Sequence, residues 1–243
     1  MIFYLKFVYI YITSTIIVPI FFIIPALINR LFYKNKYKIC QYYNNFMFTK
    51  LFFINFVEKG FPLIDNGIVI SNHITIFDGG IDSAINNTEC IARRLVNIMM
   101  LFNGLIVMIE KWGIMINRNN TSRHDLIKKI KDKLKNINRI LLYPEGTRKK
   151  YYIDGTKITK DLIRTNLKYG TLKSIYNEVE SIPIQINISS KERILLECLK
   201  IDLYIYRSDI INPKDYNTFE DFIDKIIDEW VICYNKCNDM IKY

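Results

Sequence analysis

The longest uninterrupted apolar stretch of the chain lies near its N-terminus and runs from Phe7 to Ile28 without a charged residue. A stretch of this length can cross the hydrocarbon core of a bilayer. Lys6 precedes it, and a heavier basic group follows it, namely Arg30, Lys34, Lys36 and Lys38. Because positive flanks stay on the cytosolic side, we expect a membrane segment with the rest of the chain in the cytosol. Pro19 and Pro25 leave open a kinked or re-entrant segment, and a buried helix of a globular domain is the third alternative.

A second apolar stretch, Phe46–Val57, is rich in aromatic residues and too short to span a membrane. It is typical either of a helix at a membrane interface or of the first core helix of a domain, and periodicity alone does not separate the two. We therefore predict a membrane anchor and interfacial segment over residues 1–60, followed by one globular domain over residues 61–243.

From Gly67 onward, short apolar runs alternate with amphipathic helical patterns. The runs predict strands at Gly67–Ser71, Cys90–Arg93, Ile114–Ile116, Arg139–Tyr143, Ile182–Ser189 and Ile194–Tyr206, the last as one strand or a hairpin-like pair. Apolar residues recur at helical spacing after Thr121 or Ser122, either of which can cap a helix, and again after Thr218. This alternation is typical of an α/β fold, so we predict a mixed β-sheet covered by helices, with the N-terminal membrane-associated helical segment attached.

Composition adds a preference for an anionic partner. The 243 residues carry a formal net charge of +10, and 50% of them are hydrophobic, which allows a sizeable core. No nucleic-acid-binding motif is present and the lysines are spread along the chain, so we expect no nucleic-acid partner. The cysteine count is odd (five), no CxxC pair occurs and there are only two histidines, which predicts reduced thiols and no structural metal site.

Candidate chemistry lies where one predicted strand ends. His73 follows the apolar run Ile68–Ile70 and has Asp78 five positions on. Histidine can accept the proton of an alcohol near neutral pH, and a carboxylate at its other ring nitrogen increases its basicity. If the chain turns into a helix after Asn72, Asp78 can return to His73 across one helical turn. The alternative is a helix capped by Asn72, with a purely structural His73.

A second strand end, after Ile140–Leu142, carries Pro144, Glu145, Gly146, Thr147 and Arg148. The proline ends the strand and the glycine permits a tight turn. Arg148 can bind a phosphate through two hydrogen bonds. Glu145 would repel phosphate, so we expect it either to hydrogen-bond a substrate hydroxyl or to orient Arg148. An ordinary turn with a surface ion pair is the alternative interpretation.

These two segments resemble motifs of the glycerolipid acyltransferases, the family of the lysophosphatidic acid acyltransferases. Asn72 to Asp78 matches NHxxxxD, and Pro144 to Arg148 reads PEGTR. Trp112–Arg118 resembles the motif in which a glycine and an apolar run precede an arginine, and Ile182–Ile184 resembles the apolar strand with proline. The four segments follow the family order.

Some neighbouring positions qualify the resemblance. Arg93 and Arg94 lie where the family often carries a basic pair, which makes them further candidates. Two positions depart from the usual pattern of the family. Lys149 occupies a position where a small hydroxyl residue is usual, and Met115 one where an aromatic residue is usual. These departures bear on substrate preference rather than on His73.

The resemblance implies an enzyme that moves a fatty acyl group from acyl-CoA, as co-substrate and without a cofactor, to a hydroxyl of a lysophospholipid. His73 would be the base and Asp78 its partner, and the acceptor pocket would comprise Arg118, Glu145, Gly146, Thr147 and Arg148. The expected acceptor is lysophosphatidic acid, which becomes phosphatidic acid. The alternatives are remodelling of another lysophospholipid, such as lysophosphatidylinositol or lysocardiolipin, and a non-catalytic membrane-binding protein of the same fold. The implied location is a membrane, as a single-pass or monotopic protein with the catalytic domain facing the cytosol, and an endoplasmic reticulum-like membrane in a eukaryote.

Overall fold

A seven-stranded sheet runs through the centre of the molecule. The computed structural model describes residues 5, 8–9, 12–13, 18–33, 38–93, 101–116, 122–153, 156–178, 180–197 and 201–241. The strand order is β1-β7-β6-β2-β5-β3-β4. The strands are β1 (Asn55–Gly60), β2 (Gly67–Ser71), β3 (Glu89–Arg93), β4 (Ile114–Ile116), β5 (Arg139–Leu142), β6 (Ile184–Ser189) and β7 (Asp202–Ile211). Every neighbouring pair is parallel except β6 and β7, so the predicted mixed sheet is confirmed.

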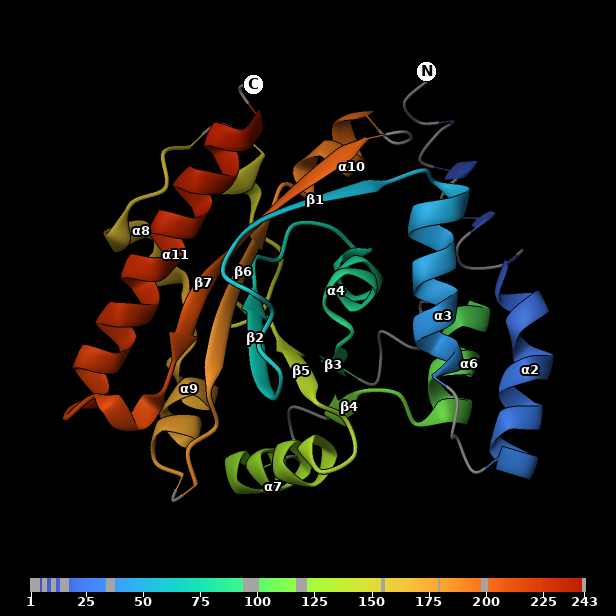
Figure 1. The fold of residues 1–243 in the computed structure, drawn as a ribbon, viewed down its shortest axis with the longest axis horizontal. Coiled ribbons are helices and arrows are strands. Elements are labelled where there is room, and N and C mark those ends of the chain that lie inside the picture. The colour runs from blue at the N-terminus through green and yellow to red at the C-terminus, as the bar shows by residue number, and fades with distance from the viewer. Residues whose placement is uncertain are drawn as a thin grey trace.

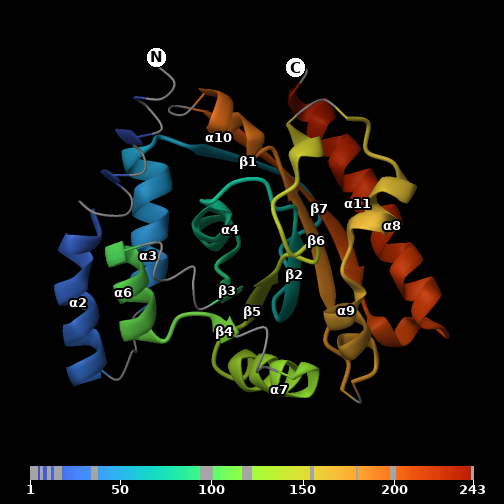
Figure 2. The same ribbon diagram turned by 180° about the vertical axis from the view of Figure 1, so that it is seen from behind.

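Helices cover both faces of this sheet (Figures 1 and 2). One face carries α7 (Arg123–Leu134), α8 (Lys160–Asn166), α9 (Tyr169–Tyr176) and α11 (Phe219–Ile241). The other carries α2 (Val18–Tyr33), α3 (Ile39–Asn45) with the π-helical segment Phe46–Leu51, α4 (Asp78–Asn86) and α6 (Leu101–Glu110). The short α10 (Glu192–Glu197) joins β6 to β7, and single 3-10 turns lie at Lys150–Tyr152 and Pro213–Asp215.

The central strand β2 shows why both layers form. All five of its residues are buried. Ile68 and Ile70 belong to the core under α11, whereas Val69 belongs to the core under α6. Successive side chains of a strand point to opposite faces, so an uninterrupted apolar run requires cover on both sides. The segment that follows β2 therefore starts from a fully buried strand at the centre of the sheet.

Helix starts agree with the capping residues expected from the sequence. The Ser122 hydroxyl accepts the Asp125 N–H at 3.0 Å where α7 begins, and the Thr218 hydroxyl accepts the Asp221 N–H at 3.1 Å where α11 begins. Such side-chain caps satisfy backbone donors that a helix leaves unpaired at its first turn.

Two segments differ from the sequence prediction. The expected strand Ile194–Tyr206 begins instead as helix α10, and β7 starts only at Asp202. The apolar stretch Phe46–Val57 is helical as far as Leu51 and then turns into β1, which pairs with β7. The first prediction failed, whereas the second holds for the helical part, whose Met47 and Phe48 lie in the core. Short apolar runs fit helix and strand equally well, and partners distant in sequence decide between them.

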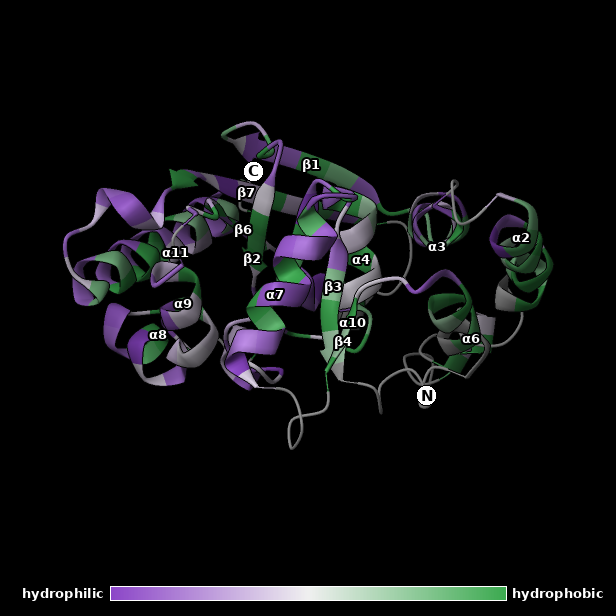
Figure 3. Ribbon diagram, turned by 90° about the horizontal axis from the view of Figure 1, so that it is seen from below, coloured by the Kyte–Doolittle hydropathy of each residue, from purple (hydrophilic) through white to green (hydrophobic). Residues whose placement is uncertain are grey.

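Helix α2 presents large apolar side chains to solvent. Phe21, Leu31 and Phe32 are 73%, 72% and 75% exposed. Figure 3 shows α2 mainly in the colour of hydrophobic residues, whereas α7 carries a hydrophilic outer face. No helix in the described ranges has the length and apolar character needed to cross a membrane. Several positions of Phe7–Ile28 lie outside those ranges, so a membrane segment there stays a prediction.

Candidate active site

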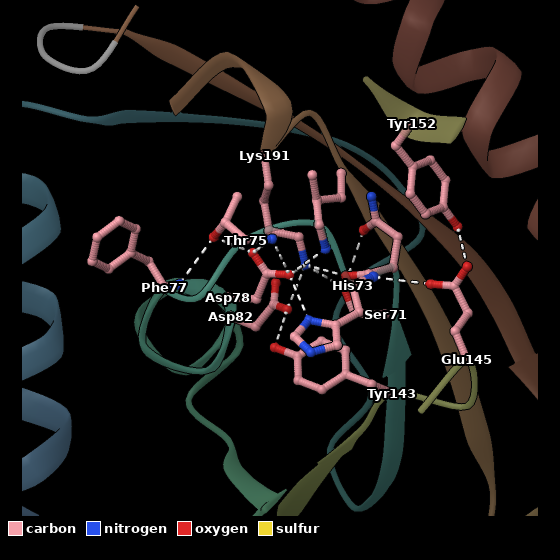
Figure 4. Close-up of polar contacts among 12 residues, drawn as sticks. Ser71, His73, Thr75, Phe77, Asp78, Asp82, Tyr143, Glu145, Tyr152 and Lys191 are labelled. Carbon is pink, nitrogen blue, oxygen red and sulfur yellow. Dashed lines mark hydrogen bonds and ion pairs between the residues drawn. The ribbon is translucent and has the colours of Figure 1, made fainter. Parts of the chain in front are cut away.

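His73 and Asp78 meet just beyond the end of β2. The chain leaves β2 at Ser71, makes a tight turn and enters α4 at Asp78. Here His73 Nδ1 lies 2.9 Å from Asp78 Oδ2. The His73 side chain keeps 24% of its surface exposed, whereas that of Asp78 has none. One ring nitrogen is thus held from inside the protein, and the other nitrogen, Nε2, is the one that can face a substrate (Figure 4).

The Asp78 carboxylate also organises the turn around it. It accepts the backbone N–H of Ile74 at 2.5 Å, and the N–H and the hydroxyl of Thr75 at 3.0 and 2.6 Å. Burial opposes its ionisation, but the charge of Lys191 and the hydrogen bonds from His73 and Thr75 outweigh it, so the pKa of Asp78 is lowered. An ionised carboxylate is an acceptor only, so the His73 Nδ1–H donates to it and Nε2 is left as the basic nitrogen.

Asn72 joins this turn to the neighbouring strand. Its side-chain amide donates to the Ser189 carbonyl at 2.9 Å and accepts the Ser189 N–H at 3.2 Å. Helix α4 begins six residues later, at Asp78. The alternative in which Asn72 caps a helix is therefore wrong, because its side chain fastens the end of β2 to the end of β6.

The ends of β2 and β5 bring Glu145 next to His73. The two strands are parallel neighbours in register, with Ile70 opposite Leu142. The carboxyl ends of parallel strands share one edge of a sheet, which is where α/β proteins gather reacting groups. Glu145 Oε2 accepts the His73 backbone N–H at 3.0 Å, and the Lys149 N–H donates to the His73 carbonyl at 2.8 Å. Glu145 of the PEGTR segment and Lys149 directly after it thus hold the backbone of His73 from both sides.

The Glu145 side chain is oriented toward the interior of the protein. It is fully buried, and its Oε1 accepts the hydroxyls of Tyr151 and of Tyr152, the latter at 3.0 Å. Burial raises the pKa of Glu145, while Tyr151 and the His73 N–H oppose that rise. Its carboxylate binds these buried partners and not Arg148, while the predicted contact with a substrate hydroxyl stays a prediction. The two tyrosines stand three and four positions after Arg148, and nothing in the sequence distinguishes them from ordinary aromatic residues.

Tyr143 supports the imidazole from its flat side. Its ring stacks on His73 with centroids 4.5 Å apart and an interplanar angle of 17°. Its hydroxyl donates to Asp82 Oδ2 at 2.8 Å, and burial raises its pKa well above the ordinary value. Tyr143 directly precedes the PEGTR segment, but no pattern in the sequence indicates its role beside His73. Together, Asp78 on the edge and Tyr143 on the face fix the orientation of the ring.

The remaining residues of the predicted acceptor pocket lie on the outer side of the same turn. Gly146 has φ +68°, a left-handed conformation that favours glycine. Thr147 and Arg148 are exposed, and Arg148 has no ion pair within the described ranges. Arg118 and Arg94 lie outside those ranges, as does the side chain of Arg93, so their predicted roles stay predictions. The structure thus brings His73, Asp78 and the PEGTR turn together, with one guanidinium directed away from the core.

Comparison with known proteins identifies the family and supports the fold. Residues 55–184 match the profile of the Acyltransferase family. A solved structure, the 1-acyl-sn-glycerophosphate (LPA) acyltransferase PlsC from Thermotoga maritima, is similar to this fold with a TM-score of 0.68 and 19% sequence identity. The similarity covers 100% of this chain and 96% of that one. No protein of curated function matches the sequence. More than half of the chain, including His73, Asp78 and the PEGTR turn, lies within the family match, and the protein therefore belongs to the Acyltransferase family.

Proposed function

We propose that this acyltransferase moves a fatty acyl group from acyl-CoA to the free hydroxyl of lysophosphatidic acid and forms phosphatidic acid. The observation that carries the proposal is the His73–Asp78 pair, with Nδ1 held at 2.9 Å and the ring partly exposed. Acyl transfer to an alcohol requires a base at that hydroxyl, and an imidazole oriented by a carboxylate suits the task.

The reaction proceeds in two proton transfers through one histidine. Nε2 of His73 accepts the proton of the lipid hydroxyl while its oxygen attacks the thioester carbonyl. The tetrahedral intermediate then loses the thiolate as the carbon–sulfur bond breaks, and the imidazolium returns the proton to that sulfur. Asp78 stabilises the imidazolium between these steps. No covalent acyl-enzyme is required, because the acceptor itself is the nucleophile.

The acceptor is assigned by charge and by similarity. Arg148 is exposed beside the turn that holds His73, and a guanidinium suits a phosphate monoester. We expect Arg118 to add a second cation. The solved structure of similar fold is named an acyltransferase of 1-acyl-sn-glycerophosphate, which supports the same acceptor here.

We also place the enzyme at a membrane, with its catalytic domain on the cytosolic side. The exposed Phe21, Leu31 and Phe32 on α2 support that placement, because exposed apolar clusters mark membrane or protein contacts. Such a surface brings the site to a substrate that partitions into the bilayer. The buried free cysteines of the described residues are compatible with a reducing compartment.

A transfer assay tests the proposal. Purified full-length protein in phospholipid vesicles is given labelled acyl-CoA, or an acylated carrier protein as competing donor, with a panel of lysophospholipids and monoacylglycerol. We expect labelled phosphatidic acid from lysophosphatidic acid and acyl-CoA, and a loss of about two to four orders of magnitude in turnover for His73→Ala.

The second histidine of the chain provides the control. His124 is exposed on α7, so His124→Ala should keep wild-type turnover. Equal activity of His73→Ala and His124→Ala would refute the mechanism, and a product from another lysophospholipid alone would refute the assigned acceptor.

A further inference from the structure

Directly after β6, the chain buries a lysine beside the candidate site. Lys191 has no exposed surface. Its ammonium donates to Asp82 Oδ2 at 2.7 Å, to the Asn72 carbonyl at 2.6 Å and to the Ser71 hydroxyl at 3.1 Å. Lysine is almost never fully buried unless it is paired, and here all three protons of the ammonium have an acceptor. The position of Lys191 is therefore specified by the fold.

The partners of Lys191 are the residues that support His73. Asn72 directly precedes His73, and Asp78 Oδ2, the atom that receives the imidazole N–H, lies 4.0 Å from the ammonium. The ammonium also lies 5.4 Å from the centre of the Tyr143 ring, whose other partner is His73. Figure 4 shows the Lys191 side chain reaching down toward Asp78 and Asp82, with the His73 ring below them.

The acidic groups around the Lys191 ammonium indicate its effect on the ionisation of Asp78. Asp78 is the first residue of α4 and Asp82 lies one turn further along it, whereas Glu192 comes from α10 and the Tyr143 hydroxyl from the end of β5. Two buried carboxylates this close cannot both ionise easily without a cation. Burial raises the pKa of Asp82 even though Lys191 opposes it, whereas the pKa of Asp78 is lowered, with Lys191 as the largest opposing influence.

Stability alone is a weak reason for this arrangement. Removing a lysine and a carboxylate from water costs several kcal/mol for each ion, and apolar replacements of buried pairs are often neutral or stabilising. An apolar residue at position 191 would provide neither a cation next to Asp78 nor a hydrogen-bond donor to the Asn72 carbonyl.

We propose that Lys191 is a positioning residue for acyl transfer, which fixes the strand end that carries His73 and keeps Asp78 ionised as the partner of the imidazole. The inference rests on the proposed function of the His73–Asp78 pair. Asp82 serves as the counter-ion that lets the ammonium stay buried. Lys191 touches neither substrate nor the reacting nitrogen, so its effect passes through Asp78 and the backbone of Asn72.

Three variants separate this role from a general loss of stability. Lys191→Met removes the cation and leaves Asp82 without its counter-ion. Lys191→Met combined with Asp82→Asn removes both charges, while the new amide oxygen can still accept the Tyr143 hydroxyl. Arg207→Met is the matched control, because Arg207 is also a buried cation (4% exposed) and pairs with Glu58 and Asn86 outside the site.

Melting temperature, kcat and KM per folded enzyme, and the acid side of the pH profile are measured for each variant. We expect Lys191→Met to lose about 30-fold in kcat with KM within about threefold. The acid side of its pH profile should move up by about one pH unit, because loss of the neighbouring cation favours proton uptake by the coupled His73–Asp78 pair. The double variant should recover the melting temperature and stay at least about tenfold below wild type in kcat. Arg207→Met should melt earlier and keep kcat within about threefold.

A readout without substrate keeps this inference separate from the proposed function. In protein labelled with ¹⁵N-histidine, the Nδ1 signal of His73 should respond to acidification at higher pH in Lys191→Met than in wild type. The signals of His124, the second histidine of the chain, should stay unchanged. Full recovery of kcat in the double variant, an equal loss in Arg207→Met, or an unchanged His73 response would overturn the role of Lys191. Absence of transfer by wild-type protein would refute the proposed function, and the His73 signal would still decide the inference.

Discussion

Replacing Glu145 with glutamine distinguishes a support for His73 from a substrate contact. The carboxylate accepts the His73 N–H at 3.0 Å and the Tyr152 hydroxyl at 3.0 Å, and it also accepts the Tyr151 hydroxyl. Glutamine has the same shape, and its carbonyl oxygen can keep the bond to His73. Its amide group can donate to the phenol oxygens once their hydroxyls rotate. The position therefore accepts a neutral side chain without leaving the His73 N–H unpaired.

The energies follow from these bonds. Hydrogen bonds to a charged group contribute about 1.5–3 kcal/mol and neutral ones about 0.5–1.5 kcal/mol, so each exchanged bond loses about 1 kcal/mol. Burial raises the pKa of Glu145, which shows that the charged form is disfavoured there, so the neutral amide recovers part of this loss. We expect a net destabilisation of about 1–2 kcal/mol, a melting temperature lower by about 2–8 °C and kcat within about threefold of wild type.

Glu145→Ala should behave differently, because it leaves the buried His73 N–H without an acceptor and opens a cavity next to Tyr151 and Tyr152. Together these effects cost about 3–5 kcal/mol, and we expect kcat per folded enzyme to fall at least about tenfold as the His73 backbone loosens. Glu180→Gln is the control for Glu145→Gln, because it makes the same replacement at a surface position, where the Glu180 side chain is 76% exposed. Thermal unfolding and the transfer assay measure all three variants. A loss of more than about 100-fold in Glu145→Gln at an unchanged melting temperature would refute this reasoning and restore a direct contact with substrate.

Three further changes test other parts of the site. Arg148→Ala should raise KM for lysophosphatidic acid more than KM for acyl-CoA. Arg148→Lys should restore KM for lysophosphatidic acid only partly, because an ammonium cannot make the two-point contact with the phosphate. An equal loss of activity with monoacylglycerol, which has no phosphate, would contradict a contact between Arg148 and the phosphate. Phe21→Asp with Phe32→Asp should weaken binding to phospholipid vesicles in a flotation assay and leave the fold intact by circular dichroism, whereas unchanged flotation would exclude α2 as the membrane contact. Asp78→Asn should flatten the dependence of stability on acid. The lowered pKa of Asp78 stabilises the protein above the ordinary value near about 4, and this stabilisation is lost as pH falls through the folded-state value, so an unchanged acid unfolding curve in the variant would contradict the assignment.

The sequence was most informative where local pattern and chemistry agree. Apolar runs bounded by turn residues predicted β2 and β5, and the distance of five positions between His73 and Asp78 predicted their contact. These features depend on neighbours within a few residues, which a sequence displays directly. The family resemblance added the order of the motifs.

The support around His73 depends on contacts that no local pattern encodes. Lys191 meets Asp82 across 109 positions, and Asn72 meets Ser189 across 117. A lysine in a sequence predicts a solvated surface, so its burial follows only from the crossing of β6 beside β2. The inward orientation of Glu145 likewise depends on two tyrosines that read locally as ordinary aromatic residues.

Because β1 pairs with β7, the first strand of the sheet stays unpaired until the C-terminal part of the chain has been synthesised. β1 lies at the edge of the sheet and β7 is its neighbour there, with Asn55 opposite Asp202. During translation, β1 leaves the ribosome long before β7 exists, and contacts of such large sequence separation form slowly. Until then the apolar segments around it stay uncovered and prone to aggregation. A chain truncated before Asp202 would keep every residue of the His73–Asp78 pair and yet leave its first strand without a partner. The yield of active protein should therefore depend on residues 202–243, although neither His73 nor Asp78 lies among them.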